Sequence, residues 1–196
     1  NLESVYFGGG TPTTLTAEEL GALLSAVDKA FDLTTVREYT VESGRPDTIT
    51  KEKLDTLYQG GVTRISINPQ TFNDRVLENI GRKHTAAMTE EAFCMARDAG
   101  VRNINMDLIA GLPGDTTESF AASVDKAISF TPENITVHTL SLKRSSNMGT
   151  SGTHFDRLQG RAADEMLHYA YKALTEQAYF PYYMYRQART LGNLEN

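Results

Sequence analysis

Two patterns of apolar and polar positions alternate along the chain. Short apolar runs bounded by turn residues predict strands, and apolar residues spaced three and four apart predict helices with one buried face. The predicted strands cover residues 5–7, 36–41, 64–68, 103–109 and 135–142. The predicted helices run from Thr16 to Phe31, Thr50 to Gly60, Asp74 to Ile80, Thr89 to Gly100, Asp115 to Phe130 and Asp156 to Gln177.

Local capping signals support the helix starts. Thr16 with Glu19, three residues later, has the pattern of a capping box. Thr50 and Thr89 are predicted N-caps, and Asp115 with Glu118 is expected to cap the helix that follows a Leu-Pro-Gly turn.

Strand–helix units with crossovers of this length predict parallel strands and an α/β fold. Five such units suit an open doubly wound sheet or part of a (β/α) barrel. A complete barrel needs about 250 residues, so at 196 residues any barrel is incomplete. Because no linker or low-complexity segment divides the sequence, we expect one domain over 1–196, with about five or six parallel strands and outer helices.

Polar residues stand at or near the carboxyl ends of the predicted strands, where buried parallel strands would be apolar. They are Gly8–Thr11, Glu42, Asn68, Gln70, Asp107, Ser141 and Lys143. The carboxyl ends of parallel strands lie at one edge of a sheet, which is the usual place for a ligand. We therefore expect these groups to converge on a binding site.

Two carboxylates among them leave alternatives open. Asp107 lies inside an apolar strand, where a lone charge is costly, so it needs a cation, hydroxyl donors or a ligand. An ion pair with a helix residue is an equally good explanation. Glu42 suits ribose hydroxyls, although a role in capping a loop is slightly favoured.

The remaining polar candidates have ordinary explanations beside the functional ones. Arg82 is a solvated loop arginine or a fork that grips a carboxylate. Gln70 satisfies a turn or contacts a ligand. His84 and His138 lack partners at metal-ligand spacing, so we interpret them as loop and strand residues.

Other residues fit core positions. Cys94 lies on a predicted helix and is expected to be an inert core thiol. The cluster Tyr179, Tyr182, Tyr183 and Tyr185 offers a stacking platform, but a terminal strand with alternate faces buried is the favoured interpretation.

The glycine stretch Gly8-Gly9-Gly10-Thr11-Pro12 follows the first apolar run directly. Without side chains, a ligand can lie against the main chain, and glycine reaches backbone angles closed to other residues. The stretch lacks the Lys-Ser/Thr pair of a phosphate-binding P-loop and the third glycine of the dinucleotide fingerprint. A turn that serves another kind of ligand is therefore the better interpretation.

Composition narrows the class of protein. Hydrophobic residues make up 40% and charged residues 22%, as in ordinary globular proteins, and the apolar runs are too short to span a bilayer. A net charge of -6 argues against a general nucleic-acid binder. The single cysteine excludes a disulfide framework, suits a reducing, cytoplasmic location, and cannot by itself hold an iron–sulfur cluster. Because the sequence starts at Asn1 rather than Met, we expect a piece of a longer protein.

Taken together, the motifs resemble the radical S-adenosylmethionine (SAM) enzymes of the oxygen-independent coproporphyrinogen III oxidase group. The resemblance runs in order over essentially the whole chain, through Gly8–Pro12, Glu42, Arg64–Gln70, Ile80–His84 and Asp107–Gly114. Ser43–Pro46, Asn68–Thr71 and the ending Tyr182–Asn196 are most similar to its coproporphyrinogen dehydrogenase branch.

The resemblance implies a partial barrel with SAM across its carboxyl face. Gly8, Gly9 and Gly10 would meet the methionyl part of SAM, and Gly9 and Glu42 would contact the SAM that binds the cluster. Gly10, Thr11, Gln70, Arg82 and Asp107 match positions at a second SAM. Ser141 stands where the family often has alanine, so only a backbone contact would transfer.

The family also implies a [4Fe-4S] cluster, whose Cys-x-x-x-Cys-x-x-Cys motif would precede Asn1. This chain is therefore expected neither to hold the cluster nor to be active alone. In the intact enzyme, with an electron donor protein, radical chemistry would convert porphyrinogen propionates to vinyl groups in haem biosynthesis. Arg82, Lys143 and Arg144 would complement the polyanionic substrate. A haem carrier of the same family, and a barrel enzyme with a phosphorylated substrate, are the alternatives.

Overall fold

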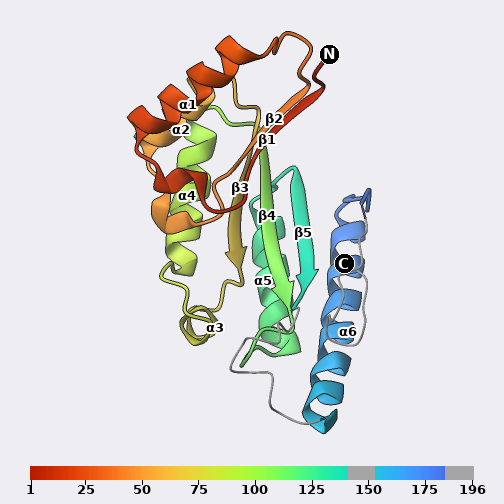
Figure 1. Ribbon diagram of the computed structural model, residues 1–196. Helices are drawn as coiled ribbons and strands as arrows, with labels where there is room; N and C mark the ends of the chain where they lie inside the picture. Colours follow the sequence, from red (N-terminus) through yellow and green to blue (C-terminus); the bar gives the residue numbers. More distant parts are fainter. Residues whose placement is uncertain (141–152, 184–196) are drawn as a thin grey trace. The chain divides into compact units, whose positions relative to one another are not determined.

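The computed structural model describes residues 1–140 and 153–183, with the backbone alone over 153–160. Five strands lie in chain order in one parallel sheet (Figure 1), which confirms the predicted α/β class. The strands are β1 (Ser4–Phe7), β2 (Glu38–Glu42), β3 (Arg64–Gln70), β4 (Asn103–Ala110) and β5 (Asn134–Thr139). The α-helices are α1 (Ala17–Ala30), α2 (Lys51–Gln59), α3 (Asp74–Asn79), α4 (Ala86–Asp98), α5 (Thr117–Ser129) and α6 (Thr153–Glu176).

The chain divides into two compact units. The first holds Asn1–Pro69, His84–Met106 and Pro132–Asn134, and the second holds Gln70–Lys83, Asp107–Thr131 and Ile135–Asn196. The single domain over 1–196 stays a prediction.

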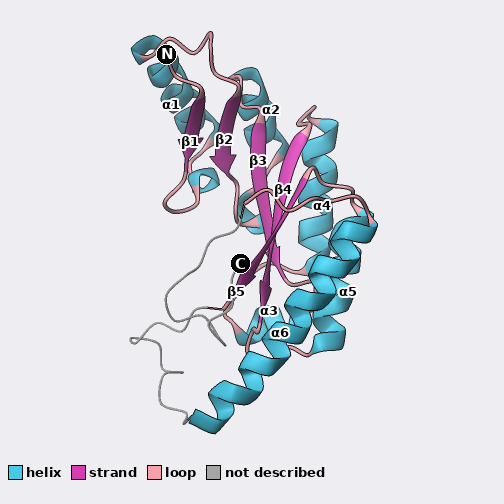
Figure 2. Ribbon diagram, turned by 90° about the vertical axis from the view of Figure 1, so that its right-hand side faces the viewer, coloured by secondary structure: helices cyan, strands magenta, loops and turns pink. Residues whose placement is uncertain are grey.

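The core of the first unit lies between its helices and one face of its strands. Helices α1 and α2 pack together beside β1 and β2 (Figure 2), and Leu20, Leu54 and Leu57 are almost fully buried there. These leucines recur at helical spacing, so each helix buries one face. Strand β3 contributes Ile65 and Ile67, which have no exposed area.

Helices α5 and α6 pack against each other and form the core of the second unit (Figure 2). Phe120 and Val124 of α5 and Met166 of α6 are buried. The backbone N–H of Gly111, just after β4, donates to the sulfur of Met166 at 3.2 Å.

Strands β3 and β4 each have one apolar and one polar face. Successive side chains of a strand point to opposite faces. In β3 the apolar Ile65 and Ile67 alternate with Arg64, Ser66 and Asn68, and in β4 the buried Ile104, Met106 and Leu108 alternate with Asn103, Asn105 and Asp107. The polar residues predicted at the ends of these two strands thus belong to a polar face that runs along each strand.

Helix starts agree with the local signals in part. The capping box of Thr16 and Glu19 is present, and Thr50 caps α2. Two other expectations were wrong by a few residues: Thr85, not Thr89, caps α4, and Thr116, not Asp115, caps α5. In each case several residues with capping side chains stand close together, and the tertiary position of the helix selects among them.

Two expectations about single residues were also wrong. Cys94 is exposed, because the core face of α4 is made by its neighbours Ala92, Phe93 and Ala96. Residues 179–183 form no strand, and Tyr182 and Tyr183 are largely exposed rather than alternately buried. Tyr185 lies outside the described residues.

The described helices include none that is both long and apolar enough to cross a membrane.

Candidate functional site

The glycine stretch leaves β1 in a conformation that depends on two of its glycines. Gly9 has a φ of 88°, in the left-handed region that side chains disfavour. A Cβ at Gly8 would stand 2.8 Å from the Oε2 atom of Glu42. Gly10 has neither constraint, because its Cβ would meet nothing within 4 Å. The stretch is exposed, so its main chain is accessible to a ligand.

Glu42, at the end of β2, holds this glycine turn. The pairing of β1 with β2 sets Phe7 opposite Val41, so Gly8 follows beside Glu42. The N–H of Gly9 donates to Oε2 of Glu42 at 3.3 Å, and the hydroxyl of Tyr6 donates to Oε1. Of the two alternatives for Glu42, the described contacts show the loop-capping one.

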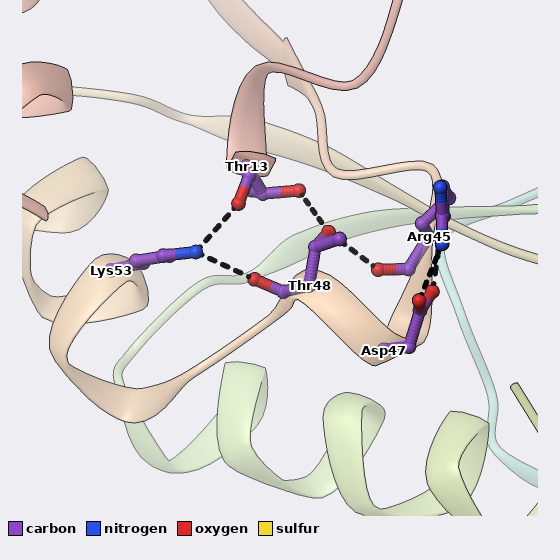
Figure 3. Close-up of polar contacts among 5 residues, drawn as sticks. All are labelled: Thr13, Arg45, Asp47, Thr48 and Lys53. Atoms are coloured by element: carbon purple, nitrogen blue, oxygen red, sulfur yellow. Dashed lines mark hydrogen bonds and ion pairs between the residues drawn. The ribbon is translucent and has the colours of Figure 1, made fainter. Parts of the chain in front are cut away.

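The segment that follows Glu42 is fixed by an ion pair (Figure 3). The guanidinium of Arg45 contacts both oxygens of Asp47, at 3.1 and 2.5 Å. Hydrogen bonding from Arg45 lowers the pKa of the Asp47 carboxyl. This bidentate pair orders the exit of β2 close to the glycine turn.

The polar face of β3 carries side-chain atoms without partners. Ser66, which is paired in register with Glu42, has a buried hydroxyl oxygen that makes no hydrogen bond with the described residues. The Oδ1 atom of Asn68 is likewise buried and makes no hydrogen bond with the described residues. A buried polar atom that lacks a hydrogen-bond partner within the protein is costly. Such atoms usually bind a ligand or a water molecule.

Gln70 is the most strained of the candidate residues. It has a φ of 67°, in the left-handed region, although it is not glycine. Its side chain is buried, and Oε1 has no hydrogen-bond partner in the part of the chain that the structure describes. Strain and an unpartnered amide oxygen in one residue are typical of functional positions.

Asp107 pairs with a neighbouring strand rather than with a helix. Its Oδ2 lies 3.7 Å from Nε2 of His138 on β5, and both side chains are partly exposed. The ion pair with a helix residue that the sequence left open is not the contact seen at this position; the carboxylate instead lies beside the imidazole of a strand histidine. Both residues belong to the second unit.

The other candidates divide between described and undescribed positions. The guanidinium of Arg82 has no ion-pair partner within the described ranges. His84 is buried, and its Nε2 donates to the carbonyl oxygen of Pro69 at 3.1 Å, which fits a structural histidine. Ser141, Lys143 and Arg144 lie outside the described residues.

The described contacts therefore join some of the predicted residues. They bring together Gly8, Gly9 and Glu42 in the first unit. Thr11 is joined to the next turn through its carbonyl oxygen, which accepts from Thr14. Gln70, Arg82 and Asp107 belong to the second unit.

The sequence interpretation gave no role to two residues of these clusters. Tyr6 was treated only as part of an apolar strand, and His138 as an ordinary strand residue. Sequence features that could have indicated both residues are present. Tyr6 shares a strand face with Gly8 through the two-residue period of a strand. His138 is a polar residue one position before the end of its strand, where site residues are common.

A metal cluster does not fit the residues of this chain. Iron–sulfur clusters need three or four cysteine ligands, and the sequence has one. Among the described residues, no three His, Cys, Asp or Glu side chains gather where they could hold a metal ion. SAM is different, since an exposed glycine main chain and a nearby carboxylate suit its amino-acid and hydroxyl groups.

Comparison with known proteins gives the class first. Residues 1–127 match the model of the radical SAM superfamily, and the chain belongs to this superfamily. Its sequence is 48% identical, over its full length, to the oxygen-independent coproporphyrinogen-III oxidase-like protein HemZ of Bacillus subtilis. It is 37% identical to the heme chaperone HemW of Lactococcus lactis over 72% of the chain.

Solved structures share the fold. The coproporphyrinogen III oxidase HemN of Escherichia coli matches with a TM-score of 0.78 and 24% identity, covering 91% of this chain and 41% of that one. An archaeal Elp3 matches with a TM-score of 0.67 and 17% identity, covering 85% of this chain and 44% of that one. The predicted partial barrel of the radical SAM type is confirmed.

The chain spans only part of these relatives. It covers 39% of the Bacillus subtilis protein and 37% of the Lactococcus lactis protein.

Proposed function

We propose that the protein containing this chain is a radical SAM enzyme that oxidatively decarboxylates a porphyrinogen, as coproporphyrinogen III oxidases do. The observation that carries the proposal is the 48% identity, over the full chain, to a coproporphyrinogen-III oxidase-like relative. A second relative, from Paracoccus denitrificans, is named an oxygen-independent coproporphyrinogen III oxidase and is 34% identical over 70% of the chain.

In this proposal the chain provides part of a SAM site. The main chain of Gly8–Thr11 would receive the amino-acid end of SAM, and Glu42 would accept hydrogen bonds from SAM hydroxyls while it keeps the turn in shape. In the second unit, taken by itself, Gln70 has a buried amide oxygen to offer to a second SAM, Arg82 a guanidinium without an ion-pair partner among the described residues, and Asp107 a carboxylate beside His138. Ser141 would add only a backbone contact.

SAM supplies radical chemistry in this superfamily when it is bound with a [4Fe-4S] cluster. The cluster does not fit the residues of this chain, so its ligands would have to come from elsewhere in the intact protein. The residues described here would bind and orient SAM, and we expect an electron donor protein to serve the intact enzyme.

The test uses the full-length protein, reconstituted anaerobically with iron and sulfide. We expect it to consume SAM and to convert coproporphyrinogen III to products that have lost CO2, detected by chromatography and mass spectrometry. A reaction without SAM is the control. SAM consumption without decarboxylated product would overturn the substrate assignment but leave the SAM site standing.

A haem-carrying role is the second candidate, because three relatives named heme chaperone are 34–38% identical to this chain over 71–72% of its length. It predicts stable haem binding by the full-length protein, seen as a Soret band, together with no porphyrinogen turnover. Turnover without haem binding would exclude it.

A further inference from the structure

The exits of β1 and β2 share one local design. Each strand is followed by a short loop and then by a 3-10 turn that begins with proline: η1 (Pro12–Thr14) and η2 (Pro46–Thr48). In each turn a threonine hydroxyl donates back to the residue before the proline, Thr14 to the carbonyl of Thr11 at 2.7 Å and Thr48 to that of Arg45 at 2.8 Å. The glycine stretch enters the first turn, and the segment after Glu42 enters the second.

The two turns contact each other directly (Figure 3). The hydroxyls of Thr13 and Thr48 share a hydrogen bond of 2.7 Å. Thr13 is 1% exposed and Thr48 is half-buried, so this contact is shielded from water on the side of Thr13. A shielded hydrogen bond between two short turns fixes their separation better than a solvated one.

Lys53 of α2 joins both turns from one side. Its Nζ donates to the carbonyl oxygen of Thr13 at 2.6 Å and to that of Thr48 at 3.1 Å (Figure 3). The last carbonyls of a short helical turn have no partner within it, and a cation is favoured there. Lys53 thus satisfies two such carbonyls that come from segments 35 residues apart.

The other contacts of the lysine agree with this role. Lys53 forms no ion pair with any side chain in the described part of the chain. Lys51, two residues earlier on the same helix, instead pairs with Asp55 at 2.6 Å and is 72% exposed. The chain therefore offers a matched control of the same residue type on the same helix.

We propose that Lys53 is a positioning residue for SAM. By holding the two strand-exit turns together, it sets the glycine main chain of Gly8–Thr11 against the carboxylate of Glu42. Lys53 touches neither group itself. The inference rests on the proposed SAM site and assigns to it a residue outside the motifs that carry the family resemblance.

The test measures SAM binding and steady-state kinetics in the full-length, cluster-reconstituted protein. Lys53→Met keeps the aliphatic stem and removes all three donors. It should raise the Kd and KM for SAM about tenfold while kcat and the cluster absorbance stay close to wild type, since supporting residues of a site commonly have effects of this size. Lys53→Arg, which keeps donors, should recover part of the affinity. Lys51→Met should bind SAM as the wild type does.

Thermal unfolding separates positioning from stability. If Lys53→Met lowers the Tm but the folded protein binds SAM with an unchanged Kd, Lys53 is only structural and the proposal is wrong. If that variant does not fold, Thr48→Val, which removes the hydroxyl contact with Thr13, should raise the Kd in the same direction, and an unchanged Kd would again overturn the proposal. A wild-type protein that binds no SAM would refute the SAM site itself, which is a different failure.

Discussion

At the scale of single residues, the lack of a side chain at Gly8 and the position of the Glu42 carboxylate depend on each other. The carboxylate, together with the ring of Tyr6, occupies the space that a Cβ at Gly8 would need, and it accepts a hydrogen bond from the N–H of Gly9. The glycine stretch is therefore shaped by a residue more than thirty positions away in the sequence. Glycine at position 8 leaves room for the Glu42 carboxylate, and that carboxylate in turn holds the glycine turn.

Substitution at this contact gives the first prediction. Gly8→Ala should displace the ring of Tyr6 and the carboxylate of Glu42, destabilise the protein by about 1 kcal/mol, the low end of overpacking costs, and weaken SAM binding. Gly10→Ala, whose Cβ meets open space at an ordinary φ, should leave the Tm unchanged. Differential scanning fluorimetry and calorimetric titration with SAM measure the two effects. An unchanged Tm in Gly8→Ala would show that the ring and the carboxylate can move aside freely.

Gln70 gives a second prediction at this scale. Gly and Ala at position 70 both remove the amide, but only glycine accepts the left-handed φ of 67° without strain. Gln70→Gly should therefore be more stable than Gln70→Ala by about 1 kcal/mol. Urea unfolding of the two variants provides the comparison, and equal stabilities would mean that the backbone relaxes once the side chain is gone.

At the scale of elements, Asp115 before α5 has a charge that the helix dipole favours and that burial disfavours. Asp115 precedes α5, where a negative charge suits the helix dipole. Its Oδ1 accepts from the N–H of Thr116 at 3.0 Å, and Oδ2 is buried. Burial raises the pKa of the Asp115 carboxyl above its ordinary value.

The pH dependence of stability follows from this direction. A raised pKa in the folded state means that the charged form is disfavoured by folding, so the cost is absent below about pH 4, the unfolded value. It develops as the pH rises through the folded pKa and is complete above it. Asp115→Asn should therefore be more stable than wild type at pH 7, and the difference should vanish in acid. Denaturant titrations at several pH values test this; a destabilised variant at pH 7 would contradict it.

At the scale of the whole molecule, the described units carry the residues proposed to bind SAM, whereas the sequence has too few cysteines to hold the cluster. The sequence has one cysteine, and Cys94 lies exposed on α4. The 196-residue chain, reconstituted by itself with iron and sulfide, should show no [4Fe-4S] absorbance and no SAM cleavage. The full-length protein is the positive control. A stoichiometric cluster on the isolated chain would overturn this account of the cofactors.

Much of the fold was predictable from local patterns. Strand positions, the capping box at Thr16 and the cap at Thr50 depend on neighbouring residues, and they were found. The N-caps of α4 and α5 were misplaced because adjacent threonine and aspartate residues compete for the same role. Cys94 was placed in the core because its neighbours are apolar, whereas the helix turns it to the other side.

The sequence by itself determined the alternation of strands and helices, the glycine strand end, the family resemblance and the lack of cluster ligands. Only the tertiary structure decided which groups meet: Glu42 with Gly9, Asp107 with His138, and Lys53 with both strand-exit turns. The physical reason is that capping and periodicity act between close neighbours in the chain. Contacts between distant segments depend instead on strand register and helix packing, which no local pattern specifies.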